Sequence, residues 1–147
     1  MDVLEFKGDY EFLSNFYPSK VYYEGVEYPT VEHAYQAAKT NDLSQREKIL
    51  KASGPGGAKK IGQSVTMRKD WEDVKIKIMK DLVRQKFENR RLRINLLDID
   101  GIIQEGNFWG DTFWGICKGK GRNELGIILM DIRSELRNKY GHYSTQE

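Results

Sequence analysis

The stretch YPTVEHAYQAAK, residues 28–39, predicts a helix that carries a polar face and a face of small residues. Thr30 is a favourable N-cap for a helix over residues 31–39. At 100° per residue, four functional side chains fall on one face of roughly 100°; they are Glu32, Tyr35, Gln36 and Lys39. The opposite face carries small or β-branched residues, namely Val31, Ala34, Ala37 and Ala38. Such a face allows close packing against neighbouring backbone.

The polar face of this helix has two interpretations. It can be a site in which a carboxylate, an amide and an amine act together. It can also be solvated surface, with Glu32 near the helix N-terminus complementing the macrodipole by about 0.3–1 kcal/mol. The periodicity alone leaves both interpretations open.

Outward from this helix, the N-terminal quarter predicts short strands and the remainder predicts helices. VLEF (3–6) is expected to be a strand, and KVYYEGVEY (20–28) a hairpin that turns at Gly25. FLSNFYPS (12–19) between them favours an irregular loop.

The helical part has the following expected elements: helix 43–52, a short helix opened by GPGG (54–57) and continuing through 58–63, helix 71–88, a short helix around 95–97, a strand over 101–106 and helix 123–139. Their expected buried residues are Leu43, Ile49, Leu50, Trp71, Val74, Ile78, Leu82, Leu125, Leu129, Ile132 and Leu136. Because strands and helices do not alternate as βαβ units, the fold class is α+β: a compact, predominantly helical single domain over residues 1–147 with a small N-terminal hairpin.

The composition excludes several classes of protein. The 147 residues carry a net charge of +2, and no run approaches the roughly 18–20 apolar residues of a membrane span. The single Cys117 excludes an intrachain disulfide framework, and a lone thiol suits the cytoplasm. Residues 68–93 hold ten Lys and Arg against five Asp and Glu, a local charge of +5 that is either a solvated helix face or an attraction for phosphate.

A second cluster of functional residues is GNFWGDTFWG (106–115), in which aromatic rings surround Asp111. Indole rings such as Trp109 offer flat surfaces for a nucleobase, worth about 1–3 kcal/mol per base. The alternative is a packed aromatic cluster in which Asp111 accepts hydrogen bonds from turn amides.

The glycine-rich, basic stretch GICKGKGRNELG (115–126) precedes a helix and is weak evidence for phosphate binding there. It lacks the P-loop pattern. His33 and His142 lie far apart, and no ligand-spaced cluster is present, so no metal is expected.

Several of these motifs together resemble the NADAR family of YbiA-like proteins. They are FLSNFYPS (12–19), YPTVEHAYQAAK (28–39), Trp71, GDTFWG (110–115) and GRNELGIILMDIR (121–133). The resemblance implies an N-glycosidase, a hydrolase that cleaves ribose from an exocyclic amine. Two substrate types are implied: early ribosylamino-pyrimidine phosphates of riboflavin synthesis, and ADP-ribose attached to guanine, which allows ADP-ribosylated nucleic acid as a partner.

Carried over residue by residue, the resemblance places the family's functional Glu, Trp and Asp on Glu32, Trp71 and Asp111, and a Lys on Lys39. Substrate-binding residues would be Asn15, Phe16, Tyr35, Gln36, Trp71 and Trp109, and weaker phosphate contacts Lys60 and Arg122. Gln63 stands where relatives often have Arg, which puts the phosphate contacts in doubt.

Two chemical routes fit these residues without a metal or redox cofactor. Glu32 and Asp111 can act as base or charge stabiliser and as acid, or Lys39 can capture C1 as a Schiff base. The rival hypotheses are a non-catalytic nucleotide or ADP-ribose binding module and a single-strand nucleic-acid binder built on the basic helix 71–88.

Overall fold

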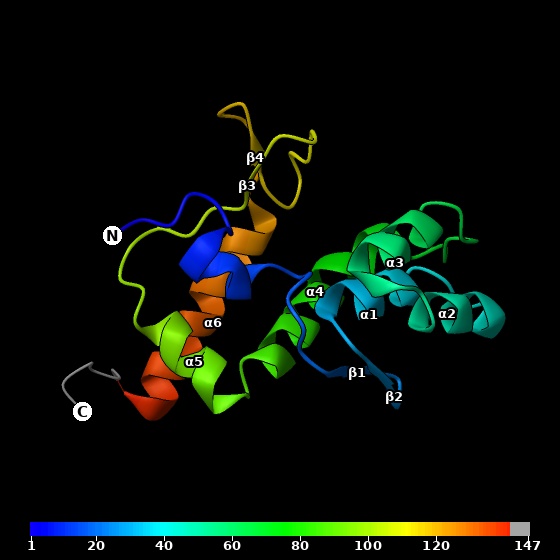
Figure 1. The fold of residues 1–147 in the computed structure, drawn as a ribbon, viewed down its shortest axis with the longest axis horizontal. Helices are drawn as coiled ribbons and strands as arrows, with labels where there is room; N and C mark the ends of the chain where they lie inside the picture. Colours follow the sequence, from blue (N-terminus) through cyan, green and yellow to red (C-terminus); the bar gives the residue numbers. More distant parts are fainter. Residues whose placement is uncertain (142–147) are drawn as a thin grey trace. The chain divides into compact units, whose positions relative to one another are not determined.

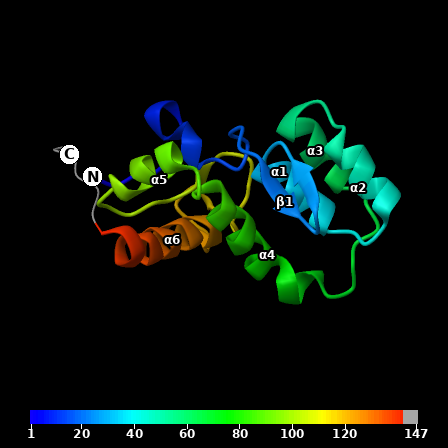
Figure 2. The same cartoon turned by 90° about the horizontal axis from the view of Figure 1, so that it is seen from below.

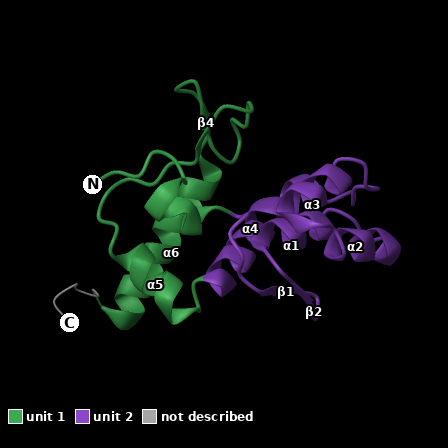
Figure 3. Ribbon diagram, viewed as in Figure 1, with its two compact units in different colours: residues 1–14, 87–147 green, residues 15–86 purple. Residues whose placement is uncertain are grey.

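The computed structural model describes residues 1–141, which its contacts divide into two compact units (Figure 3). Residues 15–86 form one, called here the α1 unit. Residues 1–14 and the chain from Phe87 onward form the other, called the α6 unit.

The α1 unit is built around its first helix. Its elements are β1 (Val21–Tyr23), β2 (Val26–Tyr28), α1 (Val31–Ala38), α2 (Leu43–Leu50), α3 (Gly54–Gly62) and α4 (Trp71–Lys86). Helix α1 contacts α2, α3, α4 and the β1–β2 hairpin (Figures 1 and 2). All eight of its residues are buried, so its polar face is not solvated surface.

Local sequence accounts for the hairpin and for the start of α1. Strands β1 and β2 pair antiparallel with Val21 opposite Tyr28, which confirms the predicted hairpin. Glu24 and Gly25 have φ values of 47° and 82°, the left-handed conformations of a two-residue I′ turn. The Thr30 hydroxyl accepts a hydrogen bond from the His33 amide at 3.0 Å, which confirms the predicted N-cap.

The remaining helices of the α1 unit begin close to the predicted positions. GPGG does open α3, since Pro55 at the first turn gives up no intrahelical hydrogen bond. The expected burial of Leu43 is wrong, because it is 75% exposed in the first turn after the Asp42 cap. Other expected core residues are buried, namely Ile49, Trp71 and Leu82, or half-buried, namely Leu50, Val74 and Ile78.

The α6 unit contains the 3₁₀ helix η1 (Gly8–Leu13), α5 (Arg90–Leu97), β3 (Gly106–Asn107), β4 (Ile116–Cys117) and α6 (Glu124–Tyr140). Helices α5 and α6 pack together. Of the apolar stripe predicted for α6, Leu125, Leu129 and Ile132 are buried and Leu136 is half-buried. Arg133 of α6 binds the start of the loop that follows α5. Its Nη1 donates to the carbonyls of Ile99 and Gly101 at 2.6 and 2.8 Å.

The predicted strands over 3–6 and 101–106 are wrong. The two stretches meet in one parallel bridge, Val3 opposite Ile103, and the chain then leaves the pairing. Val3 and Ile103 themselves are 1% and 0% exposed, whereas their neighbours Leu4 and Ile102 are 56% and 49% exposed, so the pair buries one face without extending into a sheet. The helix over Gly8–Leu13 was not predicted.

These elements confirm the α+β class, helix-rich with a small antiparallel hairpin near the N-terminus. The single domain over 1–147 stays a prediction. Within residues 1–141, no helix has the length and apolar character needed to cross a membrane.

Candidate active site

Glu32 is a buried carboxylate held at the start of α1. It is 7% exposed, and its Oε2 accepts a hydrogen bond from Gln36 Nε2 at 2.6 Å. Its backbone amide donates to the carbonyl of Asn15 at 3.1 Å. Burial of a carboxylate is costly unless it is hydrogen-bonded, so the Gln36 amide both stabilises and orients this group.

Gln36 is in turn confined by helix α3. It is 3% exposed, and its Oε1 has no hydrogen-bond partner among the described residues. A Cβ built on Gly62 would overlap the Gln36 amide, so Gly62 leaves the space that this side chain occupies. Gly62 thus confines the Gln36 amide, and the Gln36 amide holds the Glu32 carboxylate.

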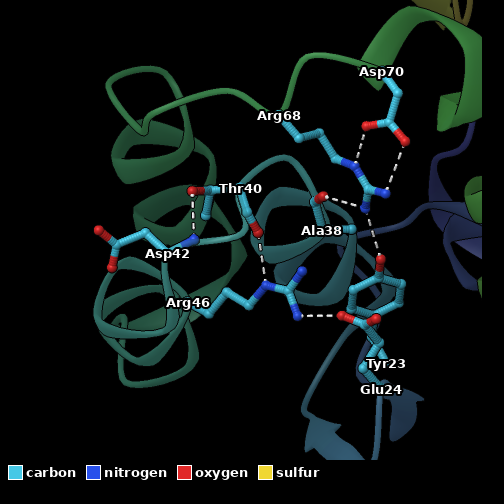
Figure 4. Close-up of polar contacts among 8 residues, drawn as sticks. All are labelled: Tyr23, Glu24, Ala38, Thr40, Asp42, Arg46, Arg68 and Asp70. Atoms are coloured by element: carbon cyan, nitrogen blue, oxygen red, sulfur yellow. Dashed lines mark hydrogen bonds and ion pairs between the residues drawn. The ribbon is translucent and has the colours of Figure 1, made fainter.

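The end of α1 is fastened by Arg68, drawn in Figure 4. The Arg68 amide donates to the carbonyl of Lys39 at 2.7 Å. Its Nη1 donates to the carbonyl of Ala38 at 3.4 Å and to the Tyr23 hydroxyl at 3.0 Å. Asp70 accepts from the same guanidinium, which holds the pKa of the Asp70 carboxyl below its usual value.

A second guanidinium, that of Arg46, binds the chain just after α1. Arg46 donates from Nε to the carbonyl of Thr40 at 2.7 Å and pairs with the Glu24 carboxylate (Figure 4). It is 9% exposed. Arg46 and Arg68 thus satisfy carbonyls at the C-terminal end of α1, where Lys39 lies, and give its side chain a fixed starting point.

Lys39 is half-buried, with its Nζ 5.6 Å from the centre of the Tyr35 ring. Burial lowers the pKa of its ammonium below the usual value, and the Glu32 carboxylate acts in the opposite direction. The positive charges of Lys59 and Lys75 lower the pKa of Lys39 further. A lowered pKa raises the fraction of neutral, nucleophilic amine at neutral pH.

Tyr35 joins this face of α1 to the first residue of α4. The Tyr35 and Trp71 ring centres are 5.2 Å apart, and the ring planes are inclined at 53°. Trp71 is only 3% exposed, which is the burial of a packing residue. Its stacking on a substrate base stays a prediction.

Asn15 and Phe16 come from the loop before β1. Asn15 is 9% exposed and donates from Nδ2 to the sulfur of Met79 at 3.4 Å, while its Oδ1 has no hydrogen-bond partner among the described residues. Phe16 is 41% exposed. Because the Asn15 carbonyl accepts from the Glu32 amide, this buried acceptor belongs to a residue in contact with Glu32, and it is suited to a ligand hydroxyl or amine.

His33, although on α1, has a structural role. Its ring nitrogens lie 2.8 Å from the Thr30 hydroxyl and 3.4 Å from the carbonyl of Ala52. Burial lowers its pKa, so the neutral ring is favoured. Within residues 1–141 there is no group of three or more His, Cys, Asp or Glu suited to a metal ion, and His142 lies outside the described residues.

Asp111 belongs to the α6 unit, where it organises the loop between β3 and β4. Its Oδ1 accepts from the amides of Phe113 and Trp114 at 3.0 and 2.9 Å. Asn107 clamps the Asp111 backbone, accepting from its amide at 3.0 Å and donating to its carbonyl at 2.9 Å. This is the turn role weighed in the sequence analysis, and it occupies one carboxylate oxygen.

The two roles of Asp111 can be separated by paired substitutions. Asp111→Asn keeps an oxygen for the two amides but removes the charge, and should lower turnover about 100-fold if the charge acts in catalysis. Asp111→Ala removes the turn contacts as well, and should also lower the melting temperature. Wild-type turnover in Asp111→Asn would limit Asp111 to holding the loop.

Trp109 and Arg122 also belong to the α6 unit and are exposed. Trp109 is 54% exposed and its ring meets that of Phe108 edge-on, with 5.2 Å between ring centres. The Arg122 guanidinium lies 4.6 Å from the centre of the Phe113 ring and pairs with Glu124.

A phosphate cradle at the start of α6 is not supported. The amides of residues 122–125 all donate to carbonyls of residues 112–115, at 2.8–3.3 Å. The donors that an anion would need at this helix N-terminus are therefore already used within the protein.

The neighbouring residues Lys59 and Lys60 have different surroundings in the structure. Lys60 is exposed, whereas Lys59 on α3 and Lys75 on α4 are close enough to Lys39 to act on its charge. Sequence reasoning missed both residues. The signal for Lys75 was its position four residues after Trp71, on the same face of α4.

The α1 unit therefore brings together most of the predicted site residues, namely Asn15, Glu32, Tyr35, Gln36, Lys39 and Trp71. Asp111, Trp109 and Arg122 lie in the α6 unit. A hollow of about 300 Å³ in the α6 unit, lined by Asp9, Tyr10, Asn95 and Asp98 among others, contains none of the predicted residues.

Comparison with known proteins shows the family of this chain. The NADAR domain family matches residues 5–137. N-glycosidase YbiA of Escherichia coli is 38% identical over 132 residues, which are 87% of this chain and 82% of YbiA. A riboflavin biosynthesis protein of Vibrio vulnificus is 38% identical over 130 residues, 86% of this chain but 35% of that longer protein.

A solved structure extends the likeness to the fold. The NMR structure of E. coli YbiA matches with a TM-score of 0.81 at 33% identity, covering 100% of this chain and 90% of that one. The relatives of similar length are N-glycosidases, so this chain is a hydrolase of the N-glycosidase class. It belongs to the NADAR family.

Proposed function

We propose that the chain hydrolyses the bond between ribose C1 and an exocyclic amine of a nucleobase-like group, with its catalytic centre on the polar face of α1. One observation carries this proposal: a buried carboxylate, Glu32, held by Gln36, shares a fully buried helix with the half-buried amine of Lys39. Placing these groups inside the protein is costly, and chemistry on a bound ligand explains the placement.

In the first route, the C1–N bond breaks through an oxocarbenium-like state. Glu32 then stabilises positive charge on the sugar or takes a proton from the attacking water. The leaving amine takes up a proton from an acid as the bond breaks. The two acceptors without protein partners, Asn15 Oδ1 and Gln36 Oε1, are positions where hydroxyl or amine donors of a ligand would be favoured.

In the second route, the Lys39 amine attacks C1 of the opened sugar and forms a Schiff base as the base amine leaves with a proton. Water then hydrolyses the imine and restores the lysine. Borohydride added during turnover should trap a reduced adduct on Lys39 that is absent in Lys39→Ala, and Lys39→Ala should lose about 100-fold or more in turnover. If no adduct forms and Lys39→Arg keeps substantial activity, the positive charge alone suffices and the covalent route is excluded.

Gly62 should matter to turnover through the contact chain to Glu32. Gly62→Ala forces the Gln36 amide away from its place, so the Glu32 carboxylate loses its donor and turnover should fall about 10-fold or more. Gly57→Ala is the matched control on α3, since its Cβ would meet Ala52 at an ordinary 3.6 Å. Equal effects of the two substitutions would show that only helix packing is affected.

The proposed substrates are ribosylamino-pyrimidine phosphates or ADP-ribose attached to guanine, the latter free or in nucleic acid. The buried free thiol of Cys117 supports a reducing, cytoplasmic setting. Incubating the purified chain with each substrate type and separating the products by chromatography tests the proposal. Release of the free amine together with ribose phosphate or ADP-ribose is expected from one type, and both substrates remaining intact would overturn it.

A further inference from the structure

Two lysines on different helices accompany Lys39. Gly62 of α3 abuts Gln36 of α1, and Lys59 lies three residues before Gly62, on the same side of α3. Lys39 lies three residues after Gln36, on the same side of α1. The contact between α3 and α1 therefore presents Lys59 toward the face that carries Lys39.

Helix α4 supplies the second lysine. Its first residue, Trp71, contacts Tyr35 of α1, and Lys75 follows Trp71 by one turn on the same face. The Lys75 side chain is only 14% exposed, and its Nζ is 2.8 Å from the Glu72 carboxylate, which is 77% exposed. Lys75 is thus a largely covered cation held in one orientation.

The charges of the two lysines agree with this placement. Both Lys59 and Lys75 act on Lys39 strongly enough to lower its pKa. The Glu32 carboxylate opposes this effect on Lys39, and Glu72 pairs with Lys75. Like charges brought together in a partly buried place repel one another, and a dianionic ligand would remove that repulsion.

We propose that Lys59 and Lys75 bind the phosphate of the substrate, next to Lys39 on α1. This inference rests on the proposed function and deepens it by naming the side chains that hold the phosphate of the proposed substrates. Lysines suit this role as point charges that accept a phosphate in several orientations. The site replaces the phosphate contacts expected from Lys60, which is exposed, and from the start of α6, whose amides are already bonded.

The test compares a ribosylamino-pyrimidine 5′-phosphate with its dephosphorylated form. Lys59→Met and Lys75→Met keep the aliphatic stem and remove the charge, so each should lower kcat/KM for the phosphorylated substrate about 10-fold or more, the scale of a charged hydrogen bond. The value for the dephosphorylated substrate should stay within about twofold. Lys48→Met on α2 and Lys77→Met on α4, both at exposed lysines outside the site, are the matched controls and should change neither value.

Equal losses on both substrates, or losses in the control variants as large as in Lys59→Met and Lys75→Met, would overturn the assignment.

Inorganic phosphate and pyrophosphate give a readout that does not depend on turnover. Each should raise the melting temperature of the wild type, and neither should do so in the Lys59→Met, Lys75→Met double variant. Stronger protection by pyrophosphate would favour an ADP-ribosyl substrate, and stronger protection by phosphate a 5′-monophosphate. Identical protection of wild type and double variant would contradict the site even if no glycosidase substrate has been found.

Discussion

Replacing Glu32 by glutamine should lower turnover by about 100-fold or more, the range expected for a positioned acid–base group. The exchange is nearly isosteric, and the new amide oxygen can still accept the hydrogen bond from Gln36 Nε2. The free energy of unfolding should therefore change little, and the substrate should still bind. Steady-state kinetics and urea unfolding of the same preparation measure both quantities.

The matched control for this substitution is Glu47→Gln on α2, where the carboxylate is exposed and pairs with Lys51. It should leave turnover and stability unchanged. Wild-type turnover in Glu32→Gln would remove Glu32 from the chemistry, and a large loss of stability would make its role that of a buried packing group.

Replacing Trp71 by alanine should have the largest effect on stability, about 3–5 kcal/mol for removal of a buried indole. Trp71 is 3% exposed and packs against Tyr35, the ring over which Lys39 lies. Loss of the indole leaves a cavity beside this face of α1. Urea unfolding monitored by circular dichroism gives the change in free energy.

Trp71→Phe is the control, because it keeps an aromatic ring against Tyr35 and should lose less than half as much stability. A well-folded Trp71→Ala variant with weakened substrate binding would contradict the packing role and support stacking on the base. Unchanged affinity in that variant would eliminate stacking.

The elements of the fold that depend on local chemistry could be predicted from the sequence. The Thr30 cap, the turn at Gly25 and the apolar stripe of α6 each act within a few residues. The strand over 3–6 could not, since a strand requires a partner and the run at 101–106 supplies only the bridge to Ile103.

In the candidate site, too, residues placed by local spacing could be predicted, and residues placed by the packing of two helices could not. Helical periodicity alone placed Glu32, Gln36 and Lys39 on one face and left open whether that face is solvated; in the structure Glu32 and Gln36 are buried and Lys39 is half-buried. Gly62 and Lys59 were missed because their positions follow from the packing of α3 on α1, which no spacing within one helix reveals.

A single-turnover experiment tests the central claim most directly, with the purified chain in excess over a glycosylamine substrate. Substrate occupancy and free amine are followed in the same sample. The account predicts stoichiometric conversion to free amine and sugar aldehyde by the wild type, and full occupancy with at least about 100-fold slower conversion in Glu32→Gln. Full occupancy of the wild type by intact substrate would contradict it and make the chain a nucleotide-binding module.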